Sequence, residues 1–306
     1  MRRPTGRAAA PRLSRVARGR ERWFYLLVSP WLLGLVLFEA GPLLAVVAMS
    51  FLDWPLPRPP RFVGLENLEA LGRDPLFGRS LLNTAYYAAG VVPLGLALGL
   101  ALAVLLRRPR RGVRLFRTLV FLPAVLSGVA MALLWSWVFN PRFGLVNRLL
   151  ALVGVTGPGW LHSESWAMPT LILLGLWGAG VNMVVYLAAL DAVPRELHEA
   201  AALDGAGPWG RFRHVSWPLL TPVTFYLAVV NVVGAFQVFT PTYLLTGGGP
   251  DHATLTLPLY LYQNAFTYGR LGYAAALALA LLAFVGLLTV AQFRVFARRV
   301  FYLGAG

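Results

Sequence analysis

Residues 272–293 read GYAAALALALLAFVGLLTVAQF, a stretch that contains no acidic or basic side chain. A helix needs about 20 mostly apolar residues to cross the hydrocarbon core of a bilayer, so this stretch is long enough to span one. Five more stretches meet the same criterion, and they cover residues 24–51, 80–106, 118–139, 168–190 and 218–245. The sequence therefore predicts an all-α, polytopic membrane protein with six transmembrane helices in one domain, residues 23–300.

The composition excludes several classes of protein. Hydrophobic residues make up 58% of the chain and charged residues 13%, and the mean hydropathy is +0.65, which is typical of a membrane protein and not of a soluble enzyme. Every basic residue is an arginine, and there is no cysteine. Without a lysine the chain has no P-loop of its own, and without a cysteine it has no thiolate chemistry. We therefore expect no catalytic residue and no cofactor.

The net charge of +15 reflects membrane orientation and not nucleic-acid binding. The arginines lie between the apolar stretches, whereas a nucleic-acid-binding domain carries them on a polar surface. With the N-terminus inside, 20 of the 27 arginines fall in inner segments, as the positive-inside rule requires. The predicted topology is thus N-in and C-in. Residues 1–22 are predicted to be a disordered basic cytoplasmic tail beside anionic lipid headgroups, and residues 301–306 end the second inner tail.

The inner loop 191–217 is richer in acidic residues and in helix formers than a simple linker. A short amphipathic helix is predicted after Pro194, because Pro favours the start of a helix and Gly205 stands where a helix would end. A second short helix is predicted for residues 208–214. The residues near one face of the first helix are Leu197, Ala200, Ala201 and Leu203 or Asp204. Two interpretations remain open, namely a helix that binds only lipid and a helix that fits a groove in a cytoplasmic partner.

A spaced motif in this loop gives a family resemblance. Glu199-Ala200-Ala201 is followed after three residues by Gly205, and after nine more by Val215-Ser216-Trp217-Pro218. This pattern resembles the EAA signature of the permease subunits of binding-protein-dependent ABC importers, with Val215 and Trp217 where Ile and Leu are usual. The resemblance implies a type I importer permease fold in which this loop is the coupling helix that docks into an ATPase subunit. The residues expected to carry the contact are Glu199, Ala200, Ala201, Asp204 and Gly205.

A second motif narrows the resemblance. Leu244-Leu245-Thr246-Gly247-Gly248-Gly249-Pro250 is similar to the outer loop of carbohydrate-type permeases, which implies a sugar, or alternatively a polyol or glycerol phosphodiester, as solute. A flexible glycine turn at Gly247, Gly248 and Gly249 is expected to meet a binding protein or to shape the pore mouth. The implied partners are a second permease subunit in a heterodimer, two ATPase subunits that hydrolyse ATP and an extracytoplasmic solute-binding protein. The implied location is the bacterial cell membrane.

Polar side chains within the spans are candidates for the solute pathway. Asn182 and Tyr186 lie one helical turn apart in the fourth span, and Gln237 stands among aromatic residues at 236–239. The alternative is that these amides only bond neighbouring helices, and this alternative is favoured for Asn231 and Asn83. An ion-gradient-driven transporter is the rival class, but Glu39 is the only acid within an apolar span.

No metal site is predicted. His198-Glu199 begins like the zinc-protease pattern His-Glu-x-x-His, but the second histidine position is Ala202. The four histidines also fall in separate loops, so they are not expected to surround one ion.

Overall fold

The computed structural model describes residues 15–108 and 111–296. The predicted tail residues 1–14 and tail end 301–306 lie outside the described residues. In chain order the elements are α1 (Arg15–Gly34), η1 (Leu35–Ala40), α2 (Gly41–Ser50), β1 (Leu52–Asp53), β2 (Arg61–Phe62), α3 (Glu66–Arg73), α4 (Pro75–Leu106), α5 (Val113–Phe121), η2 (Leu122–Val125), α6 (Gly128–Val138), α7 (Leu145–Leu152), η3 (Trp160–His162), α8 (Glu164–Leu176), α9 (Ala179–Asp191), α10 (Arg195–Leu203), α11 (Pro208–Arg211), η4 (Phe212–Ser216), α12 (Trp217–Phe236), η5 (Thr242–Thr246), α13 (Leu257–Tyr262), η6 (Gln263–Thr267) and α14 (Leu271–Phe296).

Long apolar helices dominate the fold, and the only described strands, β1 and β2, form a two-residue antiparallel pair. Four of the predicted spans coincide with continuous or gently broken helical segments near their expected bounds. These segments are Trp23–Ser50, Pro75–Leu106, Glu164–Asp191 and Leu271–Phe296. The fifth segment, Pro208–Phe236, begins ten residues before the predicted span 218–245 and ends nine residues earlier. Part of the inner loop is therefore continuous with the fifth span.

The third predicted span, 118–139, is not straight. Its two helical arms, α5 with η2 and then α6, meet at an angle of 106°. Pro123 lacks a backbone N–H, and Leu126 and Ser127 are extended with ψ of 143° and 135°, so the helical hydrogen bonds stop there. The described residues thus contain five helices long and apolar enough to cross a membrane, or six if this bent pair forms one span.

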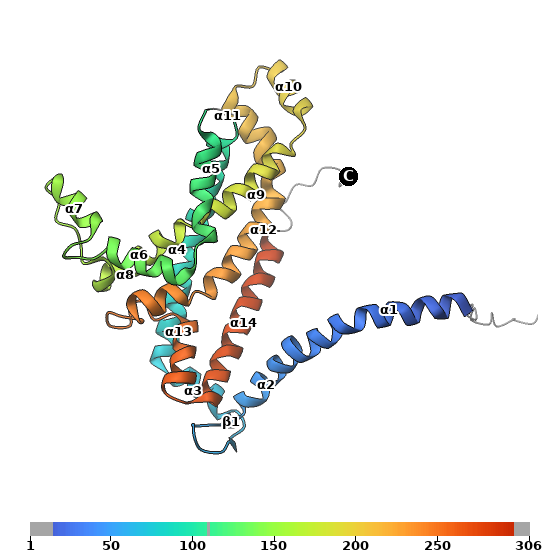
Figure 1. The fold of residues 1–306 in the computed structure, drawn as a ribbon, viewed down its shortest axis with the longest axis vertical. Coiled ribbons are helices and arrows are strands. Elements are labelled where there is room, and N and C mark those ends of the chain that lie inside the picture. The colour runs from blue at the N-terminus through green and yellow to red at the C-terminus, as the bar shows by residue number, and fades with distance from the viewer. Residues whose placement is uncertain (1–14, 109–110, 297–306) are drawn as a thin grey trace, which may run out of the picture.

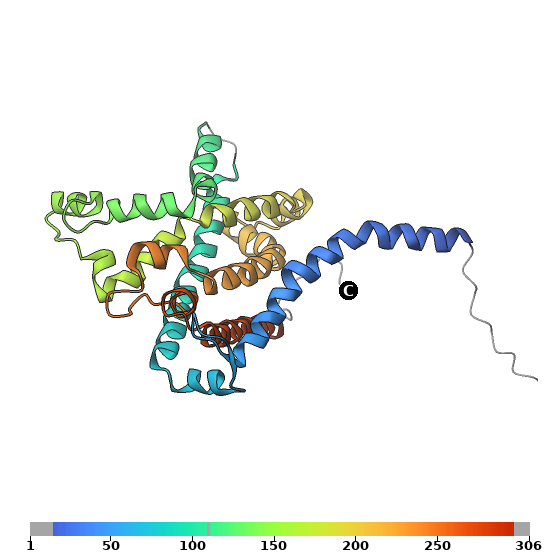
Figure 2. The same ribbon diagram turned by 60° about the horizontal axis from the view of Figure 1, so that its bottom comes forward.

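The first span is an arm that leaves the helical body. α2 packs on α14, whereas η1 and α1 extend away from the other helices in both views (Figure 1 and Figure 2). None of the most apolar window of Trp23–Ser50 is buried. Helix α1 already begins at Arg15, within the segment predicted to be a disordered tail. Glu39 lies on the exposed surface of this arm.

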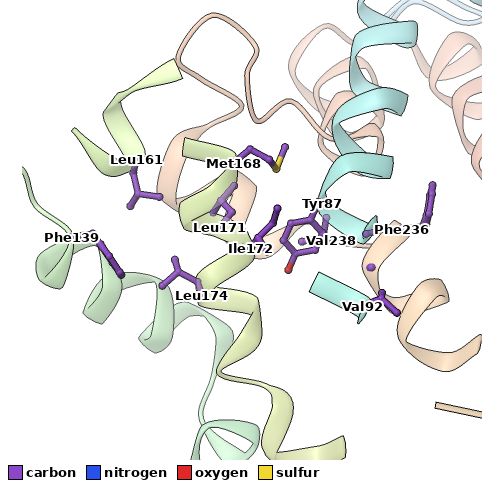
Figure 3. Packing of buried hydrophobic residues seen from close by; sticks show 12 residues of the cluster. Tyr87, Val92, Phe139, Leu161, Met168, Leu171, Ile172, Leu174, Phe236 and Val238 are labelled. Atoms are coloured by element: carbon purple, nitrogen blue, oxygen red, sulfur yellow. The ribbon is translucent and has the colours of Figure 1, made fainter. Parts of the chain in front are cut away.

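The main core lies where α4, α6, α8 and the end of α12 meet (Figure 3). Large side chains from these helices bury one another here, while glycines allow the helices to approach. An added Cβ at Gly90 would lie 2.6 Å from the Ile172 side chain, and one at Gly99 would lie 2.6 Å from Asn182 Cβ. Small residues therefore fix the close crossing of α4 with α8 and α9. The cluster includes Tyr87, Val92, Phe139, Leu161, Met168, Leu171, Ile172, Leu174, Phe236 and Val238.

The opposite ends of the bundle are tied by polar contacts. At one end, the Asp74 carboxylate caps α4 through the Leu76 N–H (2.9 Å) and accepts hydrogen bonds from the hydroxyls of Tyr260 and Tyr273. Burial opposes ionisation of this carboxyl, but the hydrogen bonds outweigh burial and lower the pKa of Asp74. At the other end, Arg107 binds the Leu190 carbonyl (2.8 Å), which joins the ends of α4 and α9. These two ends carry the candidate outer and inner surfaces, respectively.

Asn83 also links distant segments at the first of these ends. Its amide nitrogen donates to the carbonyls of His252 (2.8 Å) and Leu255 (3.0 Å). The interpretation of Asn83 as a structural link between segments therefore agrees with its contacts.

Candidate functional site: the inner loop and the break after α12

The predicted coupling loop forms a short helix with a well-defined end. Pro194 precedes α10 with extended backbone (ψ 134°), and Gly205 follows it with a left-handed φ of +78°. The Gly205 N–H donates to the Ala202 carbonyl (3.1 Å), and the Ala206 N–H donates to the Ala201 carbonyl (2.9 Å). This pair of bonds is a Schellman C-cap, which requires a residue that tolerates positive φ. The EAA-pattern glycine is therefore the helix stop that the sequence predicted.

Helix α10 stands at one extreme of the molecule and leaves most of its surface open (Figure 1). It contains no buried residue, and Glu199, Ala200 and Asp204 are all exposed. Leu203 is 90% exposed, and Trp209 at the start of α11 is 70% exposed. An exposed leucine beside an exposed tryptophan is an unusual feature for a loop in water and is typical of a surface that another molecule covers.

The orientation of α10 differs from a simple amphipathic helix lying on its apolar face. Only Ala201 of the predicted apolar face is partly covered, whereas Leu197 and Leu203 are exposed. The side that turns toward the rest of the chain instead carries His198, which lines a cavity with the ends of α4 and α11. The apolar residues of the loop are therefore free for a partner outside this chain.

The second half of the loop is the beginning of the fifth span. α11, η4 and α12 follow one another without a gap, so that Pro208–Phe236 forms one helical segment. The π helix η4, which has wider turns than an α-helix, directly precedes α12. Within α12, Pro218 and Pro222 cannot donate backbone hydrogen bonds. The predicted helix 208–214 is thus part of a longer rod that runs into the bundle.

Asn182 and Tyr186, two of the pathway candidates, are buried in the chain's own helix packing. Asn182 is 5% exposed and exchanges hydrogen bonds with Asn231 on α12, with amide distances of 3.1 and 3.4 Å. Tyr186 is 1% exposed and its hydroxyl donates to Thr224 on the same helix (3.2 Å). These contacts fasten α9 to α12. The sequence did not single out Thr224 as a partner, because the two residues are 38 positions apart.

Gln237 differs from those residues, because it lies where α12 ends. Its backbone N–H donates to the Gly234 carbonyl (3.2 Å) in the last turn of α12, while its side chain is exposed. The chain then runs without helix until Thr240. An exposed amide at a break between two helical segments within an apolar region is available to a polar ligand.

An aromatic group that the sequence did not predict lies just beyond this break. Phe239 stacks on Tyr243 (centroids 5.2 Å apart) and contacts Tyr262 (5.0 Å), which in turn contacts Phe266 (5.1 Å). Tyr243 and Phe266 are exposed. The group joins residues from η5, α13 and η6, so sequence spacing alone could not reveal it. The only sequence signal was the aromatic pair that flanks Gln237 and Val238.

The glycine turn after η5 is held by hydrogen bonds of the Thr254 side chain. Gly247 and Gly248 have positive φ of +60° and +93°. The Thr254 hydroxyl oxygen lies 2.7 Å from both the Gly249 carbonyl oxygen and the Thr246 hydroxyl oxygen, within hydrogen-bond distance of each. Gly248 is buried, and an added Cβ there would lie 3.2 Å from Leu255. Only Gly247 of the three is exposed, so any contact with another protein involves this residue first.

In the described ranges, no group of three or more His, Cys, Asp or Glu side chains is placed to hold a metal ion.

Comparisons with known proteins bear on this arrangement. The model of the family described as binding-protein-dependent transport system inner membrane component matches residues 95–302. The sn-glycerol-3-phosphate transport system permease protein of Escherichia coli O157:H7 is 38% identical over 290 residues, which are 92% of this chain and 97% of that protein. The lactose transport system permease protein of Rhizobium radiobacter is 38% identical over 240 residues, or 76% and 80% of the two chains.

A solved structure has the same fold. The crystal structure of a bacterial ABC transporter involved in the import of alginate, an acidic polysaccharide, matches with a TM-score of 0.81 at 23% identity. The match covers 92% of this chain and 96% of that chain. This similarity confirms the predicted helical, polytopic architecture.

Proposed function

Because this chain belongs to the family of inner membrane components of binding-protein-dependent transport systems, we propose that it forms half of a sugar pathway and couples that pathway to ATP hydrolysis through α10. It is a multi-pass membrane protein and a permease of the ABC importer class. The observation that carries the coupling proposal is the exposed apolar surface of α10 and α11, capped by Gly205 and continuous with the fifth span.

Helix α10 fits the groove of an ATPase subunit. Leu203 and Trp209 supply apolar contact area, Ala200 lets a partner backbone approach, and the acidic Glu199 and Asp204 flank that surface. The chain has no lysine for a P-loop, so ATP is hydrolysed in a separate subunit. A movement of that subunit turns α10, and the rod from Pro208 to Phe236 carries the movement into the bundle.

The solute pathway passes the break at Gln237. An amide that can donate and accept hydrogen bonds, followed by exposed aromatic ring faces, suits a solute with hydroxyl groups and apolar C–H faces. No charged residue occurs in α12 or in the break to η5, so the local chemistry favours a neutral solute. The lactose permease relative agrees with a neutral sugar. The glycerol-3-phosphate permease relative supports a glycerol phosphate ester as the second candidate class.

The complete transporter has further parts. A second permease subunit supplies the other half of the pathway, in a heterodimer. A solute-binding protein delivers the sugar at the end of the bundle that carries β1 and the turn at Gly247. Two ATPase subunits act at the end that carries α10, which faces the cytoplasm of a bacterium because the arginine-rich segments stay inside.

The coupling test uses the transporter purified with its own partner subunits. Leu203→Glu introduces a charge into the proposed contact, where burial without a partner is costly. The control is Leu152→Glu, because Leu152 is 82% exposed and belongs to α7, which lies far from α10 in Figure 1. We expect Leu203→Glu to release the ATPase subunits and abolish sugar-stimulated hydrolysis, while Leu152→Glu retains both. Normal assembly and hydrolysis in both variants would show that α10 is not the docking element.

The solute test compares Gln237→Ala with Gln263→Ala. In the wild-type chain the Gln263 amide donates a hydrogen bond to the Gly247 carbonyl (3.5 Å). We expect Gln237→Ala to raise the KM for uptake and to leave the amount of assembled transporter unchanged. A panel of neutral oligosaccharides and of glycerol phosphodiesters, each at saturating binding protein, identifies the solute class. An unchanged KM in Gln237→Ala would remove Gln237 from the pathway.

A further inference from the structure

A basic cavity lies behind α10, on the side away from its exposed apolar residues. It has a volume of about 250 Å³ and is lined by the ends of α4 and α9 and by α10, α11 and η4. This volume is far above the 10–15 Å³ that a single water needs. Its polar wall carries Arg107, Arg108, Arg211 and His198. Among the described residues that line it, none is acidic.

The positive charge of this cavity is only partly neutralised. Arg107 pairs with Asp191 through its Nε (3.4 Å) and also binds the Leu190 carbonyl. Arg108 and Arg211 form no ion pair with any of the described residues. Arg211 is partly buried, so its charge acts through a medium that screens it less than bulk water does. Arg108, which is exposed, and Arg211 therefore line the same cavity without an ion pair among the described residues.

His198 adds an unpaired polar atom to the cavity. Its Nε2 is buried and has no hydrogen-bond partner among the described residues. Burial, together with the charges of Arg107 and Arg211, lowers the pKa of His198, so the ring is neutral near pH 7. A neutral imidazole can carry its proton on Nε2 and donate it to an oxygen acceptor. A buried donor without a partner is costly, and a bound acceptor would remove that cost.

We propose that this cavity binds a phosphate group, held by Arg108 and Arg211 and by a hydrogen bond from His198. Guanidinium groups present several N–H donors in a planar fork that matches phosphate oxygens, and such charge-assisted bonds are the strong ones. The phosphate comes either from the headgroup of an anionic inner-leaflet lipid or from free phosphate, and both present the same oxygens. The cavity opens at the end of the bundle where the arginine-rich loops meet the headgroup layer.

Binding has a structural consequence for the loop. The three ligands come from the end of α4, from α10 and from α11, so a phosphate bridges the end of the second span to both halves of the loop. It thereby fixes the angle at which α10 stands on the bundle. The site rests on the geometry of this chain alone, and the test below measures binding and not transport.

The experiment compares three versions of the assembled, delipidated transporter. The first is wild type, the second is Arg108→Gln with Arg211→Gln, and the third is the control Arg195→Gln with Arg213→Gln. The control removes the same charge from exposed positions of the same region outside the cavity. Inorganic phosphate and, separately, nanodiscs with phosphatidylglycerol or phosphatidylcholine serve as probes. Thermal unfolding measures protection, and native mass spectrometry measures retained lipid.

In wild type and in the control we expect protection by one or both phosphate sources. In the cavity variant we expect binding weaker by about tenfold or more, as the loss of charged hydrogen bonds implies. Retention of phosphatidylglycerol without an effect of inorganic phosphate identifies the lipid as source, and the reverse identifies free phosphate. Equal binding by all three versions overturns the proposal.

A comparison within wild type keeps the proposal testable if the cavity variant does not assemble. If phosphate protects wild type no better than chloride at the same ionic strength, and phosphatidylglycerol is retained no better than phosphatidylcholine, the cavity is not a phosphate site. If the cavity variant loses only its ATPase subunits while wild type shows no phosphate effect, the arginines contact protein, and the proposal is likewise overturned.

Discussion

Replacing Gly205 by alanine tests the conformation of the coupling loop with a single methyl group. Gly205 has a φ of +78°, and an added Cβ would meet no atom within 4 Å. The substitution therefore introduces no clash, and its whole effect is the cost of a left-handed backbone for an L-residue, about 1–2 kcal/mol. That cost falls on the Schellman cap that ends α10, and not on the membrane-spanning helices.

The expected effect on docking follows from that cost. α10 has no buried residue of its own, so its last turn depends largely on the cap. A cost of about 1–2 kcal/mol lowers the equilibrium constant between the capped and the uncapped loop by a factor of about 5–30. If the ATPase groove accepts only the capped loop, the affinity for the ATPase subunits falls by up to the same factor. Titration of ATPase subunits onto the reconstituted permease pair, read by sugar-stimulated hydrolysis, measures this shift.

Gly210→Ala is the matched control, because it adds the same methyl group within α11. Its new Cβ would lie 3.6 Å from the Ala206 Cβ, an ordinary contact, and its backbone is not left-handed. Alanine favours a helix over glycine by up to about 1 kcal/mol, so the control is expected to be neutral or slightly more stable. Wild-type affinity in Gly205→Ala, or equal losses in both variants, would refute the reasoning from the cap. Gly205→Pro is expected to lose more, because proline also removes the N–H that Ala202 accepts.

Three further predictions concern the bundle. Asn182→Ala and Asn231→Ala are each expected to lower thermal stability. In a double-mutant cycle their coupling free energy is expected to be about 0.6–1.7 kcal/mol. Additive effects of the two substitutions would mean that the hydrogen bonds between the two amides contribute nothing. Gly99→Ala is expected to cost about 1–3 kcal/mol by overpacking, whereas Gly234→Ala, with no atom within 4 Å of its new Cβ, leaves the unfolding temperature unchanged. The depressed pKa of Asp74 contributes stability above the ordinary carboxyl pKa of about 3.9, which is lost as the pH falls through the folded-state value. Asp74→Asn is expected to remove this loss of stability at acid pH, which is measured as the unfolding temperature against pH. The same pH dependence in Asp74→Asn and in wild type would contradict a contribution from the Asp74 carboxylate.

Hydropathy predicted most of the membrane helices because the length and apolar character of a span are local properties of the sequence. The bend in the third span was missed for a physical reason. A run of apolar residues from 118 to 139 meets the length criterion whether or not its two halves point in the same direction. Pro123 and the extended residues Leu126 and Ser127 set that direction, and the apolar count ignores them.

The same distinction separates the parts of the site that were predicted from those that were not. Pro194 and Gly205 mark the ends of α10 through their own backbone preferences, so both were predicted. The side of α10 that turns inward depends on the cavity between α4 and α11, and no residue within α10 encodes it. His198 therefore lies inward, while Leu197 and Leu203 stay exposed. Likewise, the amide pair of Asn182 and Asn231 joins positions 49 residues apart and depends on how α9 crosses α12.

The inner loop and the break at Gln237 are the two ends of one mechanical element. The segment Pro208–Phe236 is a continuous helical rod of 29 residues, roughly 43 Å long at 1.5 Å per residue. One end joins α10 through four residues, 204–207, so α10 can turn on the rod without unwinding it. The other end stops one residue before the exposed amide of Gln237. Since Asn231 and Thr224 fasten this rod to α9, the coupling proposed above would move α9 and α12 together when α10 is pushed. In that proposal the polar residues buried in the spans transmit the movement, and Gln237, beyond the rod's end, is the residue whose surroundings change.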